Sequence, residues 1–305
     1  MVAVLIWGAN FSFIKLGMAS IPGLGFAGLR FTTATILLFL LLRWREGRVT
    51  WPTEGWGRLI LLGLLGNTGY QILFMYGLTH TSVGNVALLV GTSPVMVAVL
   101  ASITGLERLT AATRAGVALA FGGVLLVLSR SGLRLEMETL RGDAAVFLAS
   151  LCWAGYTLLL RGVREPMSSL RVTAFTMLTG SPMLLLLGLP TLLQVHWDRV
   201  TPISWTGTAY ATLLGLIVAY LMWNNGVRVV GSARTAVFGS GTPVAAMFLA
   251  WPILGERPAS LQLIGAALIV SGVLLSRRRP GPGREITADE REEMQLEAAG
   301  PMTDR

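Results

Sequence analysis

Residues 83–104 read VGNVALLVGTSPVMVAVLASIT and contain no charged side chain. A helix needs about 20 apolar residues to cross a bilayer, so this run predicts a membrane span. Strands of a membrane barrel would alternate polar and apolar residues, which apolar runs such as 122–128 and 183–189 do not do. Pro94 lies near the centre of the run and leaves a carbonyl of its helix without a donor. We therefore expect a kink at Pro94, which can also serve as a hinge.

The rest of the chain follows the same pattern. Of 305 residues, 53% are hydrophobic and 13% are charged, whereas soluble chains carry roughly 25% charged residues. Arg, Gly and Pro separate apolar runs, and these runs predict an all-α polytopic membrane protein with ten transmembrane helices. The predicted helices are residues 2–19, 23–42, 57–78, 83–104, 112–129, 143–160, 170–193, 204–227, 233–254 and 260–276.

The run 83–104 has a counterpart 149 residues further along. Gly91-Thr92-Ser93-Pro94-Val95 matches Ser240-Gly241-Thr242-Pro243-Val244, and without a gap Glu107-Arg108 falls on Glu256-Arg257. Each copy holds five predicted helices, and because five is odd the second copy enters the membrane from the opposite side. We expect two inverted repeats, at 1–129 and 143–276, and a charged cytoplasmic tail at 277–305. Inverted repeats are typical of secondary transporters, although a channel can share the architecture.

Basic residues predict the orientation in the membrane. Fourteen Arg residues lie on one set of alternate loops and in the first residues of the tail, and five lie on the other set. Cytoplasmic loops carry the excess of Lys and Arg, so both termini are expected in the cytoplasm of a cell whose inner or plasma membrane holds the protein. No basic segment precedes residues 2–18, so we expect no cleaved signal peptide there, and a short N-terminal segment is expected to be missing.

Several functions do not fit these residues. The formal charge of +8 comes from residues that flank apolar runs, so nucleic acid is not an expected partner; the lipid bilayer and a small-molecule substrate are. One Cys and two distant His do not form a metal site. Residues 23–28 match a dinucleotide-binding pattern but open a membrane helix, and no phosphate-binding loop is present, so no cofactor is expected. A membrane enzyme, the alternative class, would need convergent catalytic groups. The sequence offers none within its spans, so no enzyme is expected.

Several motifs together are family-like. They are Trp7-Gly8-x-x-Phe11, Leu29-Arg30-Phe31, and the Pro-centred fourth and ninth helices, each followed by Glu-Arg. Over residues 1–276 the chain resembles the EamA branch of the drug/metabolite transporter superfamily. The resemblance implies export of small metabolites, with neutral or aromatic amino acids as the nearest guess, and it does not fix the substrate. Helix 6 departs from the pattern, with Cys152-Trp153-Ala154-Gly155-Tyr156.

Polar and aromatic residues inside spans are the candidates for substrate contact, because they are costly in lipid. They form stripes on helical faces, in repeat-related positions of helices 1, 3, 6 and 8. The alternative for Trp and Tyr is an anchoring role at the membrane interface, which we assign to Trp51, Trp56, Trp197 and Trp205. Ser93 and Thr242 are expected to add polar contacts near the helix breaks. The predicted substrate-binding residues are Trp7, Asn10, Arg30, Gln71, Phe74, Asn85, Trp153, Tyr156, Tyr220 and Trp223, and the predicted hinges are Pro94 and Pro243.

Charged residues inside the spans are few. Arg30 lies roughly 10 Å into helix 2, where it either binds a substrate carboxylate or bonds helix-end carbonyls, and Lys15 either contacts substrate or snorkels to the interface. Glu107 and Glu256 are expected to cap helix ends beside Arg108 and Arg257. No Asp or Glu lies in mid-span, which favours facilitated diffusion or exchange over proton-driven transport.

Two questions of assembly and substrate stay open. Ala118…Gly122 and Ala267…Ser271 are small-residue pairs that permit close helix packing, either within each half or across a homodimer. A drug, nucleoside or lipid translocator of the same fold would have a similar cavity.

Overall fold

The computed structural model describes residues 2–105, 111–128, 137–160, 163, 167–230 and 241–276. Every regular element in these ranges is helical, and the bounds agree with the predicted runs to within a few residues. The helices are α1 (Val2–Met18), α2 (Gly23–Glu46), α3 (Trp56–Leu62), η1 (Gly63–Gly69), α4 (Tyr70–His80), α5 (Val83–Val90), α6 (Ser93–Ile103), α7 (Ala111–Leu128), α8 (Met137–Leu160), α9 (Ser169–Leu192), η3 (Trp197–Arg199), α10 (Pro202–Ala209), η4 (Tyr210–Val218), α11 (Ala219–Val230), α13 (Thr242–Leu254) and α14 (Ser260–Ser276).

Six helical stretches are long and apolar enough to cross a membrane, and three shorter apolar helices accompany them. The six stretches are residues 23–46, 56–80, 83–103, 139–160, 169–192 and 202–226. The shorter helices are 2–18, 242–254 and 260–275. The tail at 277–305 and the motif Glu107-Arg108 lie outside the described residues.

Two of the spans contain π-helical segments. The span 56–80 is α-helical at both ends and π-helical in η1, and the span 202–226 is π-helical in η4. Shifted by 149 residues, η1 falls on 212–218, within η4. A π-segment adds a residue per turn and rotates the face that follows it, and such segments often lie at functional sites.

Two further breaks are related by the same shift. The span 83–103 is interrupted at Gly91 and Thr92 and resumes as α6, while α13 begins at Thr242. The residues that precede these helices, Thr92 and Gly241, have nearly identical backbone angles: φ is −77° at both, and ψ is −11° and −15°. Pro94 and Pro243 therefore lie in the first turn of a helix, where the missing N–H has no partner to lose. The predicted kink is a break that lies just before Pro94.

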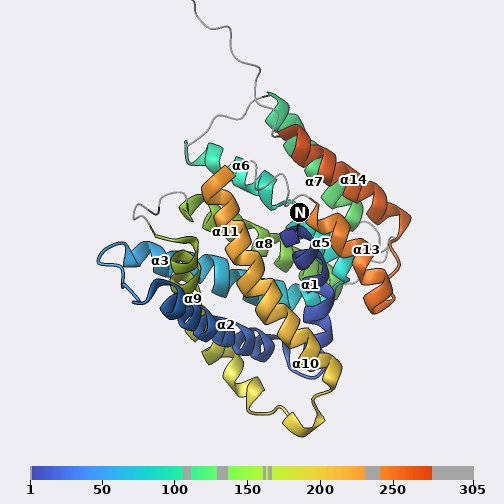
Figure 1. The fold of residues 1–305 in the computed structure, drawn as a ribbon. Helices are drawn as coiled ribbons and strands as arrows, with labels where there is room; N and C mark the ends of the chain where they lie inside the picture. The colour runs from blue at the N-terminus through green and yellow to red at the C-terminus, as the bar shows by residue number, and fades with distance from the viewer. Residues whose placement is uncertain are drawn as a thin grey trace, which may run out of the picture.

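Helices from the two halves of the chain pack against each other. In Figure 1, α2 runs beside α9 at the lower left and α7 runs beside α14 at the upper right. Helix α1 packs on α13, and α4 packs on α8. The central elements α1, α4, α5, η4, α11 and α13 enclose the core around Phe11, Phe74 and Met247.

The contact between α7 and α14 depends on two glycines that are 149 residues apart. A Cβ on Gly123 would lie 2.8 Å from the carbonyl oxygen of Gly265, and a Cβ on Gly272 would lie 2.5 Å from that of Gly116. The same shift converts one contact into the other. The small residues thus permit close packing between the halves, whereas a Cβ on Gly122, which belongs to the predicted pair, would meet no heavy atom within 4 Å.

Candidate functional site

A cavity lies among the central helices, with walls from both halves of the chain. Its space is about 860 Å³, including the part open to solvent, which is within the range of roughly 300–1,000 Å³ typical of small-molecule sites. Ten of the twelve predicted site and hinge residues line it: Trp7, Asn10, Arg30, Gln71, Phe74, Pro94, Trp153, Tyr220, Trp223 and Pro243.

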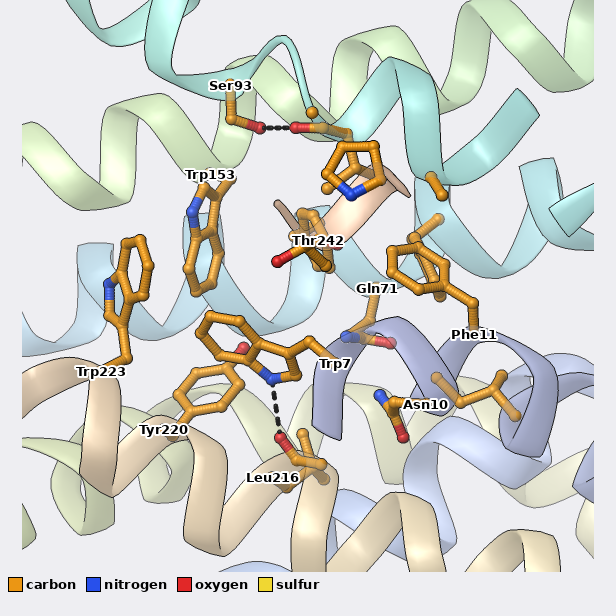
Figure 2. A pocket seen from close by; sticks show the side chains of 18 of the residues that line it. Trp7, Asn10, Phe11, Gln71, Ser93, Trp153, Leu216, Tyr220, Trp223 and Thr242 are labelled. Atoms are coloured by element: carbon orange, nitrogen blue, oxygen red, sulfur yellow. Dashed lines mark hydrogen bonds between the residues drawn. The ribbon is translucent and has the colours of Figure 1, made fainter. Parts of the chain in front are cut away.

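One side of the cavity is aromatic. Figure 2 shows Trp7 in the middle of this group, with Trp153, Trp223 and Tyr220 around it. The centroid of the Trp7 ring is 6.2 Å from that of Trp153, 5.9 Å from that of Tyr220 and 5.2 Å from that of Trp223. The indole Nε1 of Trp7 donates to the carbonyl of Gly215 at 3.0 Å, which fixes the ring. Edge-to-face and tilted pairs of this kind stabilise one another beyond simple burial.

The opposite side is polar. Gln71 and Asn10 lie there, as Figure 2 shows. Arg30 is 1% exposed and donates from Nη2 to Oε1 of Gln71 at 2.6 Å. The rings of Phe26 and Phe31 lie with their centroids 5.3 Å from Cζ of Arg30, at the distance of cation–π contacts. Arg30 is the one charged side chain among the described residues that line the cavity.

Hydroxyl groups occupy the two helix starts at the cavity wall. Ser93 donates to the carbonyl of Val90 at 2.6 Å, the acceptor that the nitrogen of Pro94 cannot use. Thr92 donates to the carbonyl of Leu89 at 2.6 Å. At the second start, Oγ1 of Thr242 is buried and has no hydrogen-bond partner in the described part of the chain. Thr242 thus leaves a polar group available within the cavity.

Asn85 and Tyr156, both predicted to contact substrate, lie outside the cavity lining. The side chain of Asn85 accepts from Nε2 of Gln262 at 2.8 Å, so it joins α5 to α14. Tyr156 is 1% exposed, stacks on Trp153 with centroids 5.2 Å apart, and packs with Leu59, Leu62 and Phe175. It supports the cavity wall from behind.

Other lining residues were not among the predicted site residues. Tyr70 precedes Gln71 and lies off the stripe that an uninterrupted α-helix would place on Gln71. The π-segment η1 ends at Gly69 and shifts the register, so Tyr70, Gln71 and Phe74 all reach the cavity, whereas Asn67 donates to the carbonyl of Thr176. The remaining additions are Phe11, Ile14, Ala87, Val90, Gly91, Gly215 and Leu216, together with Ser93 and Thr242, which were expected near the helix breaks.

A polar network joins the halves near one end of α1. Nζ of Lys15 lies 2.8 Å from Oε1 of Glu256, and Oε2 of Glu256 accepts from the backbone N–H of Val83 at 3.1 Å. The expected pairing of Glu256 with Arg257 is therefore wrong; the guanidinium of Arg257 lies 5.8 Å from the ring of Trp251. Lys15 has an ionic partner and does not simply snorkel. At the other end, Glu46 pairs with Arg171 between α2 and α9.

The sequence profile of the EamA-like transporter family matches residues 1–129 and 140–278. The chain is 30% identical over 271 residues to the uncharacterized transporter YyaM of Bacillus subtilis, covering 88% of each chain. It is 29% identical over 283 residues to a probable terminal-alkyne amino-acid exporter of Streptantibioticus cattleyicolor, covering 90% of this chain and 91% of that one. A crystal structure of another protein superposes with a TM-score of 0.65 at 20% identity over 90% of this chain and 93% of the other, a likeness of fold.

Proposed function

The chain belongs to the EamA-like transporter family of multi-pass membrane proteins, and on that basis we propose that it exports neutral or aromatic amino acids by alternating access through the central cavity. The observation that carries this proposal is the cavity itself, which combines the tryptophan cluster with Arg30, Gln71 and Asn10 between the two halves of the chain. An aromatic wall stacks apolar side chains, while amides and a guanidinium take the polar groups of an amino acid. The similarity to a probable amino-acid exporter points to the same substrate class.

The proposal includes ten membrane spans arranged as two inverted repeats, at residues 1–129 and 143–276. Three structural relationships support it: the π-segments η1 and η4, the helix starts at Ser93 and Thr242, and the reciprocal glycine contacts of α7 and α14. Each pair is related by the shift of 149 residues found in the sequence. Repeats of this kind place the substrate between them near the bilayer midplane.

We further propose that both termini face the cytoplasm of a bacterial cell and that the plasma membrane holds the protein, from the distribution of Arg among the loops. In this orientation the network of Lys15, Glu256 and Val83 lies at the outer end of the cavity. It links α1 and α5 of the first half to the residue that follows α13 in the second. Export then requires this network to separate while the opposite end closes.

Facilitated diffusion or exchange is the proposed mode of transport. Among the described residues, the cavity lining includes no Asp, Glu or His that could carry a proton with the substrate. An imposed pH gradient should therefore not drive uphill accumulation in vesicles. Such accumulation would replace this part of the proposal with proton coupling.

Counterflow in proteoliposomes tests the proposed function. Vesicles are loaded with one unlabelled amino acid at a time, and entry of labelled Phe, Met or Thr is followed. Transient accumulation that unlabelled substrate competes away is expected, and a channel would not produce it. A flat trace for every amino acid would favour a drug, nucleoside or lipid translocator.

A further inference from the structure

We infer that Arg30 and Gln71 form a carboxylate subsite and that the substrate's carboxylate, and not its ammonium group, is the charge this protein recognises. The inference deepens the proposed function, on which it rests for the size and apolar character of the ligand. It concerns which amino-acid-like molecules bind, and it excludes organic cations.

The first step is the state of the Arg30 guanidinium. A guanidinium remains charged in proteins, and a buried charge is costly unless it is paired. Arg30 is 1% exposed, yet its hydrogen bond in the described part of the chain goes to the neutral oxygen of Gln71. Its Nε and Nη1 atoms are buried without hydrogen-bond partners. No described carboxylate forms an ion pair with it. The site therefore lacks a negative charge.

The second step is the direction in which Arg30 can obtain that charge. Arg30 lines the cavity together with Gln71 and Tyr70, so a ligand in the cavity can lie against it. Arginine binds carboxylates through two parallel N–H groups, and the unpartnered nitrogens meet this requirement. Phe26 and Phe31 flank the guanidinium and hold its plane.

The third step is the orientation of Gln71. Because Oε1 of Gln71 accepts from Arg30, its amide nitrogen is the group that remains to donate to another partner. Figure 2 shows Gln71 in the cavity between Trp7 and Phe11. Arg30 and Gln71 thus offer donors to the same ligand group, and a carboxylate is the common organic group that accepts several such bonds.

The fourth step is the absence of a charged partner for an ammonium group. The described lining residues include no acidic side chain. Two neutral oxygens, Oδ1 of Asn10 and Oγ1 of Thr242, are buried without partners and can accept from an ammonium or a hydroxyl group alike. A 2-hydroxy acid should therefore replace the corresponding amino acid, whereas an amine without a carboxylate should not.

Thermal stabilisation of the purified full-length protein in detergent tests this subsite. The four probes share one ring: phenylalanine, phenyllactate, phenylalaninamide and phenethylamine. Phenylalanine and phenyllactate should stabilise the protein at concentrations at least about tenfold lower than phenylalaninamide or phenethylamine. Equal stabilisation by phenethylamine, or none by either carboxylate, would overturn the inference.

The variant Gln71→Glu separates binding from folding. It keeps the side-chain size and provides Arg30 with an internal carboxylate, so the protein should fold at least as well as the wild type. It should also weaken stabilisation by phenylalanine and phenyllactate about tenfold or more, because the ligand's carboxylate meets an occupied guanidinium and a new negative charge. Gln194→Glu, the same change on an exposed side chain, is the matched control and should bind as the wild type does. Unchanged carboxylate binding in Gln71→Glu would overturn the subsite.

The two proposals can fail separately. Carboxylate binding that disappears in Gln71→Glu, together with a flat counterflow trace for every amino acid, would leave the subsite and remove amino-acid export. Counterflow of amino acids that phenethylamine inhibits as well as phenylalanine does would leave the transporter and remove the subsite.

Discussion

Lys15 and Glu256 are 241 residues apart in the sequence, and their side chains meet at 2.8 Å. The same carboxylate accepts from the N–H of Val83, so one acidic residue joins the end of α1 and the start of α5 to the segment that follows α13. Gln262 adds a second link through Asn85. These bonds connect parts of the two halves that must separate if the cavity is to open at this end.

Removal of this ion pair should shift the protein toward the state that is open at the Lys15 end. In Lys15→Met the side chain keeps its length but no longer attracts Glu256, so a cysteine placed at Ile14, with Cys152→Ala, should react several-fold faster with an impermeant maleimide added from that end. Lys15→Arg should retain the wild-type rate. Arg199→Met is the control, because Arg199 and Asp198 form an exposed pair 3.9 Å apart that contributes little. Equal labelling in Lys15→Met and the wild type would contradict the gating role.

A glycine of α14 and a glycine of α7 should respond differently to the same substitution. Gly272→Leu would force a side chain against backbone atoms, the carbonyl of Gly116 at 2.5 Å and the nitrogen of Ala120 at 2.6 Å from the new Cβ. We expect a loss of about 1–3 kcal/mol in the free energy of unfolding, measured as a lower melting temperature in detergent. Gly122→Leu should melt with the wild type, since the added Cβ meets no heavy atom within 4 Å. A similar loss in both variants would indicate a general effect of bulk in these helices.

The positions of the helices could be predicted because lipid offers no partners for backbone groups, so that long apolar runs must be helical. The face of α1 was also predictable. Trp7, Asn10 and Ile14 follow α-helical spacing, and all three line the cavity. Most of the site residues could be found because polar and aromatic groups are rarely placed in lipid, which singles them out within apolar spans.

Two features of the site could not be read from periodicity. The π-segment η1 rotates the face of its span, which turns Asn67 toward α9 and brings Tyr70 to the cavity. Asn85 precedes the lining residue Ala87 by two positions, about 200° around the helix, so it reaches Gln262 on the other side. The pairing of Lys15 with Glu256 follows from tertiary packing between the halves, and no local pattern identifies it.

The aromatic side of the cavity should contribute to substrate affinity. In Trp223→Ala the indole that lies 5.2 Å from Trp7 is lost, so an aromatic substrate loses a stacking surface. We expect the half-saturation concentration in counterflow to rise about two- to tenfold. Trp205→Ala is the matched control, because Trp205 stacks on Trp197 at a centroid distance of 6.1 Å away from the cavity lining. An equal rise in both variants would assign the effect to the membrane environment of tryptophans.

The break before α6 should matter for the rate of transport more than for binding. Pro94 has no N–H, and the hydroxyl of Ser93 takes the carbonyl of Val90 in its place. In the double variant Ser93→Ala/Pro94→Ala the backbone N–H of residue 94 can donate to that carbonyl, so α5 and α6 can join as one continuous helix. We expect counterflow to slow several-fold, because a continuous helix resists the bend that a change of state requires.

The control for the break keeps the hydroxyl. In Pro94→Ala alone, Ser93 still competes for the carbonyl of Val90, so the effect on the rate should be smaller than in the double variant. Binding of substrate to the purified protein should change little in either variant, since neither removes a charged or aromatic group of the cavity. A double variant that binds weakly and exchanges at the wild-type rate would place Ser93 and Pro94 in substrate contact and would remove their role as a hinge.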